Sequence, residues 1–273
     1  MQSVFAREFI FMELLAYLLI GTIAGLMAGL LGVGGGLVIV PGLVVVFASQ
    51  GFADATLMHF AIGTSLASIV VTSVSSLLAH HRRGSVDWLI VRRMTPSIVV
   101  GALGGARLAG YVSSQGLGMF FGVFVLLVAL QLAFAFQPAA HRPVPRKAGL
   151  GLAGAVIGAV SALLGIGGGS LTVPFLLWNR VDIRAAVGTA AACGLPIAMG
   201  GAAGFAMGSM SAGSPPGLST GFIYWPAVAG IVLASVPMAP VGARLAHRLP
   251  QKTLQRVFSL LLAVIGLKMV LGV

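Results

Sequence analysis

The groups in this chain that could do chemistry are mainly backbone groups, in a glycine-rich segment that occurs twice. Residues 31–41 read LGVGGGLVIVP, and residues 164–174, 133 positions later, read LGIGGGSLTVP. Glycine adopts positive φ readily and carries no side chain to screen the backbone, so each segment should break a helix. A helix that starts after such a break exposes N–H groups without intrahelical partners and a partial positive charge. Two such helix starts could bind an anion without any lysine or arginine.

The predicted substrate-binding residues are glycines of the two breaks and hydroxyl side chains close to them or in matched segments. They are Gly34, Gly35, Gly36, Gly167, Gly168, Gly169, Ser170, Thr64, Ser65 and Thr189. The glycines could instead serve close helix packing of the small-xxx-small type. Each hydroxyl could instead bond to the carbonyl oxygen four residues earlier in its own helix. Four glycines and a proline in each break exceed what packing needs, which favours a binding site.

His59 is the candidate for proton coupling, because imidazole titrates near neutral pH; an ordinary interfacial histidine is the alternative. Arg107 and Arg244 occupy equivalent positions near helix ends and are interpreted as interfacial anchors. All acidic residues fall near termini or in loops, so no carboxylate relay in mid-membrane is expected. They are Glu8, Glu13, Asp54, Asp87 and Asp182.

The composition defines the class of protein to which these residues belong. The chain has 273 residues, of which 58% are hydrophobic and 8% charged, and its mean hydropathy is +1.07. Soluble domains average about 25% charged residues, so an all-α integral membrane protein is predicted. The net charge of +11 lies in short loops between apolar runs, which argues against nucleic-acid binding.

Motifs for enzymes and cofactors are missing from the sequence. No G-x-x-x-x-G-K-[ST] motif occurs, the first break lacks G-x-G-x-x-G spacing, and G-x-S-x-G fails at Thr172. No helix-paired histidines or carboxylates suggest a metal site. We therefore expect neither an enzyme nor a bound cofactor or metal. The single cysteine, Cys193, excludes an intrachain disulfide.

Ten apolar segments are candidates for membrane helices. They are residues 14–31, 37–48, 55–79, 86–111, 117–136, 149–164, 170–178, 183–208, 222–244 and 254–270. A straight helix needs about 20 residues to cross the hydrocarbon core, so the second and seventh segments are too short. Both follow a glycine string, and we expect half-helices or limbs of re-entrant hairpins.

The two halves of the chain correspond beyond the glycines. Residues 61–65 (AIGTS) match 186–190 (AVGTA), and residues 105–108 match 242–245, both GARL, at offsets of 125 and 137. The prediction is a first membrane repeat over 1–136, a cytoplasmic linker over 137–147 and a second membrane repeat over 148–273.

The distribution of charge favours inverted repeats over parallel ones. If the two segments joined by each glycine break enter and leave the membrane on the same side, thirteen of the sixteen basic residues fall on one side of the membrane. The parallel arrangement would move six of these thirteen to the outside, against the positive-inside rule. The thirteen are Arg82, Arg83, Arg92, Arg93, Arg142, Arg146, Lys147, Arg180, Arg184, Arg244, Arg248, Lys252 and Arg256.

The duplicated LGVGGG and LGIGGG breaks, each followed by a Val-Pro pair (Val40-Pro41 and Val173-Pro174), resemble the sulfite exporter TauE/SafE family of membrane permeases. The matched AIGTS/AVGTA and GARL elements extend the resemblance over the whole chain. It implies a multi-pass secondary transporter in the bacterial inner membrane that moves sulfite, organosulfonates or similar anions, often outward. If transport is coupled to protons, His59 or the titration of the substrate must carry them; uncoupled movement down a gradient is the alternative. An anion channel on the same scaffold and a non-transporting accessory protein are the alternatives.

Overall fold

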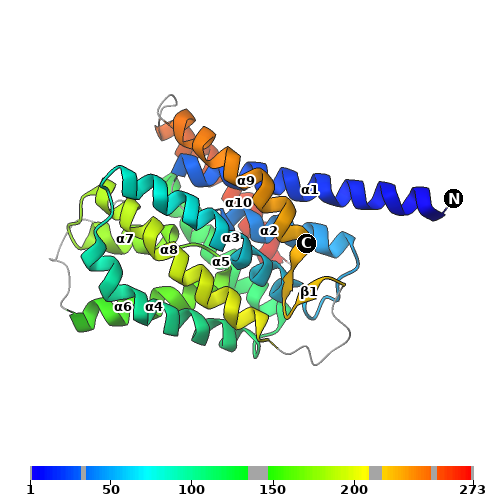
Figure 1. The fold of residues 1–273 in the computed structure, drawn as a ribbon, viewed down its shortest axis with the longest axis horizontal. Coiled ribbons are helices and arrows are strands. Elements are labelled where there is room, and N and C mark those ends of the chain that lie inside the picture. Colours follow the sequence, from blue (N-terminus) through cyan, green and yellow to red (C-terminus); the bar gives the residue numbers. More distant parts are fainter. Residues whose placement is uncertain (1, 32–34, 135–146, 209–216, 247–250, 272–273) are drawn as a thin grey trace.

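The computed structural model describes residues 2–31, 35–134, 147–208, 217–246 and 251–271, which form ten α-helices and one short hairpin (Figure 1). The helices are α1 (Gln2–Leu31), α2 (Gly36–Ser49), α3 (Leu57–Arg82), α4 (Trp88–Ala109), α5 (Ser114–Ala133), α6 (Lys147–Leu164), α7 (Gly169–Trp178), α8 (Ile183–Ala206), α9 (Trp225–Ala246) and α10 (Gln251–Leu271). The hairpin pairs β1 (Ser219–Thr220) antiparallel with β2 (Ile223–Tyr224).

The predicted all-α membrane fold is confirmed. Six helices in the described part of the chain, α1, α3, α5, α6, α8 and α9, have segments long and apolar enough to cross a membrane. Helices α2 and α7, with 14 and 10 residues, are as short as the sequence predicted. Helix α4 has 22 residues but includes Arg92, Arg93 and Arg107, which makes it less apolar than these six.

Four helix starts, those of α1, α5, α9 and α10, differ from the prediction by three residues or more. Helix α1 begins at Gln2 rather than at residue 14, and its N-terminal part projects beyond the other helices (Figure 1). Residues 2–13 are less apolar than the rest but include good helix formers such as Ala6, Glu8 and Met12, so the helix continues past the apolar segment. Helix α9 begins at Trp225, because Ile223 and Tyr224 form strand β2.

The helices pack in pairs, and each pair in the structure corresponds to a pair made by the equivalent helices of the other half. Helix α1 packs against α9, and its counterpart α6 packs against α4, which is the counterpart of α9. Helices α5 and α10 pack against each other, as do α3 and α8. This packing shows a pseudo-two-fold relation between the halves. The inverted orientation of the repeats in the membrane stays a prediction.

Glycines allow the closest of these helix contacts. A Cβ atom on Gly21 or Gly25 of α1 would collide with the carbonyl oxygen of Ile231 or Ser235 in α9. In the other pair, Gly101 and Gly105 of α4 are related in the same way to Ala155 and Ala159 of α6. Both helix pairs therefore use the small-xxx-small packing that is common in membranes.

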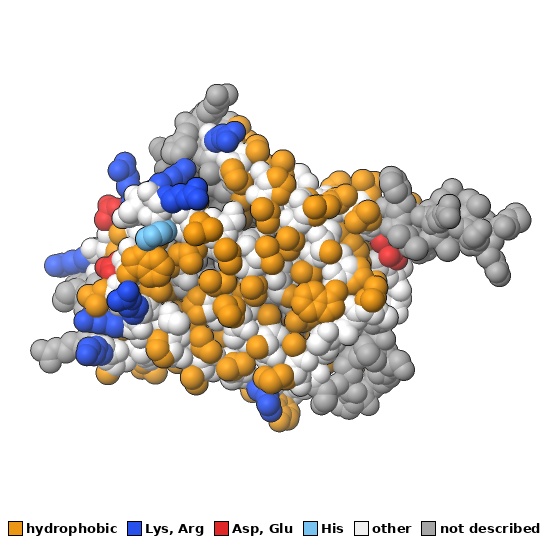
Figure 2. Space-filling view, in the orientation of Figure 1, with side chains coloured by type: hydrophobic (Ala, Val, Ile, Leu, Met, Phe, Trp, Pro, Cys, Tyr) orange, Lys and Arg blue, Asp and Glu red, His pale blue; other side chains and the backbone are white. Residues whose placement is uncertain are grey.

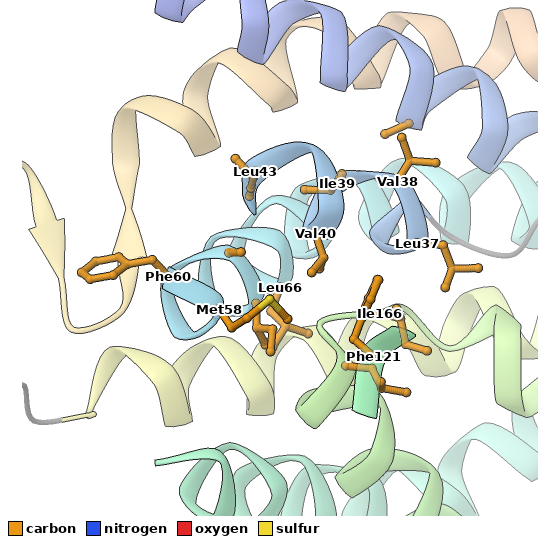
Figure 3. Close-up of a cluster of buried hydrophobic side chains, with 14 of the residues drawn as sticks. Leu37, Val38, Ile39, Val40, Leu43, Met58, Phe60, Leu66, Phe121 and Ile166 are labelled. Atoms are coloured by element: carbon orange, nitrogen blue, oxygen red, sulfur yellow. The ribbon is translucent and has the colours of Figure 1, made fainter. Parts of the chain in front are cut away.

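Helix α2 lies in the centre of the main apolar core (Figure 3). Leu37, Ile39, Val40 and Leu43 are each at most 1% exposed, and Ile166 of the second break belongs to the same cluster. A helix that is apolar all round is stable only when it is surrounded by protein or lipid. The protein encloses residues 36–41 at the start of α2, so the interrupted helix is tolerated at this place, whereas Val45 further along is 58% exposed.

Charged and apolar side chains occupy different parts of the surface. Figure 2 shows Lys and Arg side chains gathered mainly toward one end of the visible face, with apolar side chains spread across its middle. Exposed apolar residues on the membrane helices include Leu19, Val100, Leu127, Leu152 and Leu233. Such a surface is expected of a protein whose sides face lipid.

Candidate functional site

The two helices that follow the glycine breaks start without a side-chain cap. Gly35 precedes α2 and Gly168 precedes α7, and neither residue has a side chain with which to cap its helix. By contrast, Asp87, Ser113 and Asp182 cap α4, α5 and α8 by accepting hydrogen bonds from backbone N–H groups. The starts of α2 and α7 thus keep donors for another acceptor.

The two breaks contact each other, although 133 residues separate them in sequence. A Cβ atom on Gly36 would lie 2.5 Å from the carbonyl oxygen of Gly165 and 2.7 Å from Cα of Ile166. Gly165 has a φ of +67°, a conformation that favours glycine. Its carbonyl oxygen accepts a 2.8 Å hydrogen bond from Ser65 Oγ. The absence of side chains therefore brings the two breaks together at the middle of the fold.

A cavity of about 520 Å³ adjoins both breaks. Gly35 lines it from the first break, and Gly167, Gly168 and Gly169 line it from the second. Helices α1, α3, α8 and α9 supply the other walls. The polar side chains in the lining are Thr72, Ser73, Ser75, Ser76 and His80 of α3, Arg83 directly after it, and Ser235 and Arg244 of α9.

The hydroxyl groups and the basic groups lie at different depths in this cavity. Arg83 and Arg244 are exposed, whereas Ser73 and Ser235 are 8% and 1% exposed. The cavity therefore has a basic outer end and a hydroxyl-lined interior. The described lining contains no aspartate or glutamate. Such a cavity offers hydrogen-bond donors and positive potential, which suit an anion.

Ser235 is the most informative residue of the lining. Its side chain is nearly fully buried, and its Oγ has no hydrogen-bond partner among the described residues. A buried hydroxyl without a partner costs about 1–3 kcal/mol, so such groups are rare unless something else binds them. Ser235 thus carries an unsatisfied donor beside the cavity, which a ligand reaches once the side chains that cover it move.

The structure places some of the predicted binding residues at the cavity and others away from it. Gly35, Gly167, Gly168 and Gly169 line it, whereas Gly36 faces the other break. Ser170 is buried directly after Gly169 and is not among the described lining residues. Gly34 lies outside the described residues.

Thr64, Ser65 and Thr189 bond to the backbone of other elements. Ser65 binds the second break, as described above. Thr64 Oγ1 accepts a 3.0 Å hydrogen bond from Tyr224 N, directly before α9. Its counterpart Thr189 accepts a 2.9 Å bond from Asp87 N, directly before α4. Each threonine thus holds the start of a helix in the opposite half, and neither lies among the described lining residues.

His59 lies at the start of α3, far along that helix from His80. It is 5% exposed, its Nε2 is 3.0 Å from the carbonyl oxygen of Ala109, and its ring centroid is 5.1 Å from that of Phe222. Its Nδ1 has no partner among the described residues. Proton coupling through His59 stays a prediction, and it would act away from the described cavity lining.

The hydroxyl-rich face of α3 and Ser235 were not among the residues predicted from the sequence. Residues 72, 73, 76, 80 and 83 recur at spacings of three and four, which places them on one face of a helix. That pattern could have identified the face. Ser235 belongs to no motif, and only the fold brings it to the cavity.

Comparison with known proteins gives a consistent result. The model of the family described as Sulfite exporter TauE/SafE matches residues 17–269. A protein of Haemophilus influenzae named "Probable membrane transporter protein" is 34% identical over 264 residues, covering 96% of this chain and 99% of that protein. "Probable membrane transporter protein YunE" of Bacillus subtilis is 29% identical over 284 residues, covering 95% and 98%. No solved structure gives a significant match.

Proposed function

Because the chain belongs to the sulfite exporter TauE/SafE family of membrane transporters, we propose that it moves a small sulfur-containing anion, such as sulfite or an organosulfonate, as a secondary transporter. We further propose export as its direction and the bacterial inner membrane as its location. The anion binds in the cavity between the glycine breaks, and the protein exposes this cavity to the two sides of the membrane in turn.

The observation that carries the proposal is the buried Ser235 hydroxyl without a partner, in a cavity adjoining two uncapped helix starts. The oxygens of sulfite and sulfonates accept hydrogen bonds. Backbone N–H groups at a helix start and hydroxyl groups on α3 and α9 can donate to them. A volume of about 520 Å³ is ample for an anion of a few heavy atoms.

The basic end of the cavity supports entry of an anion from that side. Arg83 and Arg244 come from different helices and are both exposed. Surface charges act over about 8 Å at physiological salt, so they can raise the local concentration of an anion at the entrance. If this end faces the cytoplasm, as the charge distribution predicts, the anion enters from inside and the membrane potential drives it outward, at about 2.3 kcal/mol per charge per 100 mV.

Transport into proteoliposomes tests the proposal. Radiolabelled sulfite, thiosulfate, taurine and sulfoacetate are compared, each with and without an imposed ΔpH. We expect saturable movement of one or more of these anions, with a ΔpH response if protons are coupled. Movement proportional to concentration, without saturation, would indicate a channel. No movement of any of them by folded protein would remove the proposed substrate class.

A further inference from the structure

The two halves of the chain do not surround equivalent spaces. Each residue of the cavity has a counterpart in the other half of the chain. The residue numbers differ by 133 between α1–α2 and α6–α7, by 125 between α3 and α8, and by 137 between α4 and α9. The counterparts of the cavity walls α1, α3 and α9 are α6, α8 and α4, which lie together (Figure 1). A symmetric protein would have a second cavity among these three helices.

The space among α4, α6 and α8 is closed by direct contact. A Cβ atom on Gly204 of α8 would collide with the Cβ atom of Ala106 in α4. A Cβ atom on Gly200 of α8 would lie 3.1 Å from the carbonyl oxygen of Val99, also in α4. Gly204 corresponds to Ala79, and Gly200 to Ser75, both of which line the open cavity.

Two buried hydroxyl groups occupy positions that correspond to the lining of the open cavity. Ser161 on α6 and Thr172 on α7 are each 0% exposed, and neither Ser161 Oγ nor Thr172 Oγ1 has a hydrogen-bond partner among the described residues. Their counterparts in the other half are Ala28 and Ile39, which both line the open cavity. Hydroxyls buried without partners destabilise the packing around them, so alanine and valine would suit a permanently closed region better.

An aromatic contact closes the end of this region. The counterpart of His80 is Phe205, whose carbonyl oxygen accepts a 3.1 Å hydrogen bond from the backbone N–H of Phe222 in the hairpin. The two rings lie edge to face with centroids 6.4 Å apart. A Cβ atom on Gly208 would lie 2.7 Å from the Phe222 ring. Phe222 thus covers the position that corresponds to the basic entrance of the open cavity.

We propose that Ser161 and Thr172 are anion-binding residues of a second cavity, which opens when the α4–α6 pair and Phe222 move away from α8. In that state their hydroxyls donate to the oxygens of the sulfur oxyanion, as Ser235 does in the first cavity. The counterpart of Arg244 is the exposed Arg107, which provides a positive charge at the new entrance. Ser65, the counterpart of the cavity-lining Ala190, joins the same lining. The inference rests on the proposed function. It names the residues that contact the anion when the protein is open to the other side of the membrane.

Single-cysteine labelling tests this proposal, because Cys193 is the sole native cysteine and is buried. Ser161→Cys and Ser235→Cys are each placed in a Cys193→Ala background. A membrane-impermeant maleimide is applied to spheroplasts and to inverted vesicles of the expression host. Sulfoacetate is the added anion, since sulfite itself consumes maleimide. Val156→Cys is the control, because Val156 lies on α6 with 55% exposure on an apolar surface.

We expect Ser235→Cys to react from one side of the membrane only and Ser161→Cys from the opposite side only. Saturating sulfoacetate should slow both reactions several-fold, and Val156→Cys should not react. Reaction of Ser161→Cys from the same side as Ser235→Cys would overturn the proposal. Failure of Ser161→Cys to react in a variant that still transports would also overturn it. If Ser161→Cys does not fold, Thr172→Cys is expected to show the same sidedness.

The labelling result and the transport result are separable. If the cysteines react from opposite sides but no sulfur anion is transported, the proposed second cavity is supported and the proposed substrate class is wrong. If a sulfur anion is transported but both cysteines react from the same side, the proposed transport function is supported and the proposed second binding site is wrong.

Discussion

The C-terminal half of α3 and the corresponding half of α8 have the same position in the two repeats and opposite character. In α3, Thr72, Ser73, Ser75 and Ser76 line the cavity. Their counterparts in α8 are Ile197, Ala198, Gly200 and Gly201. The hydroxyl groups of α3 line a cavity in which water or an anion can be hydrogen-bonded. The small apolar residues of α8 instead allow this helix to pack closely against its neighbours. The duplicated fold is therefore open on the face that carries hydroxyl groups and closed on the face that carries glycines.

This comparison separates the roles of the two glycine breaks. A Cβ atom on Gly168 would lie 2.6 Å from the carbonyl oxygen of Ala190 and 2.9 Å from Gly194 N, both backbone atoms of α8. A Cβ atom on Gly35 would meet the side chain of Ala24 at 3.1 Å. Gly168 thus packs against the backbone of α8 more closely than Gly35 packs against α1.

The largest effect is expected from bulk at the breaks. Gly168→Leu and Gly35→Leu should each abolish transport, a loss of about 100-fold or more, because the side chain fills the cavity and displaces a helix start. Overpacking costs about 1–3 kcal/mol, so both variants should still insert in the membrane, Gly168→Leu with the larger loss of stability. Transport assays and thermal unfolding in detergent measure these effects.

Gly104→Leu is the matched control for these variants. Gly104 is an exposed helix glycine with no atom within 4 Å of its Cβ position, so this variant should transport normally. Normal transport by both break variants would remove the breaks from the site.

A smaller effect is expected at Ser235, which has no polar counterpart. Ser235→Ala removes one hydrogen bond to the anion, worth about 1–1.5 kcal/mol, so KM should rise about tenfold. Thermal stability without anion should rise, because the unpartnered buried hydroxyl is removed. The concentration dependence of uptake measures this. Its counterpart variant Ile98→Ala should instead lower thermal stability, since Ile98 is fully buried in the closed face. An unchanged KM in Ser235→Ala would contradict the assignment of its hydroxyl.

The basic entrance should contribute a still smaller, salt-dependent effect. Arg83→Gln and Arg244→Gln should each lower the uptake rate about two- to threefold at low ionic strength, with no difference at high salt. Initial rates at several salt concentrations give the comparison. An effect of Arg83→Gln that persists at high salt would indicate a direct contact with the anion.

The smallest effect on transport is expected at the two matched threonines. Thr64→Val and Thr189→Val each remove an acceptor for the N–H group before a helix of the opposite half, which costs about 1 kcal/mol. A fall of a few degrees in Tm is expected for each, with KM unchanged. A rise in KM without loss of stability would show instead that these threonines contact the anion.

Much of the fold could be predicted from hydropathy and the duplicated glycines. The short helices α2 and α7 followed directly from the breaks, and the matched segments indicated the pseudo-two-fold packing. The roles of Thr64 and Thr189 could not be predicted, because their partners, Tyr224 and Asp87, lie 160 and 102 residues away. The importance of Ser235 depends on what surrounds its hydroxyl, and a sequence does not contain that information.

The most direct test of the account is counterflow in proteoliposomes. Vesicles are preloaded with unlabelled sulfoacetate and diluted into a low concentration of labelled sulfoacetate. A protein that alternately exposes one anion site to the two sides exchanges internal for external anion. Labelled sulfoacetate should therefore accumulate transiently above its equilibrium level, and Ser235→Ala should require a higher concentration for the same overshoot. Entry that only approaches equilibrium, unaffected by preloading in protein that transports sulfoacetate, would contradict alternating access and favour a channel.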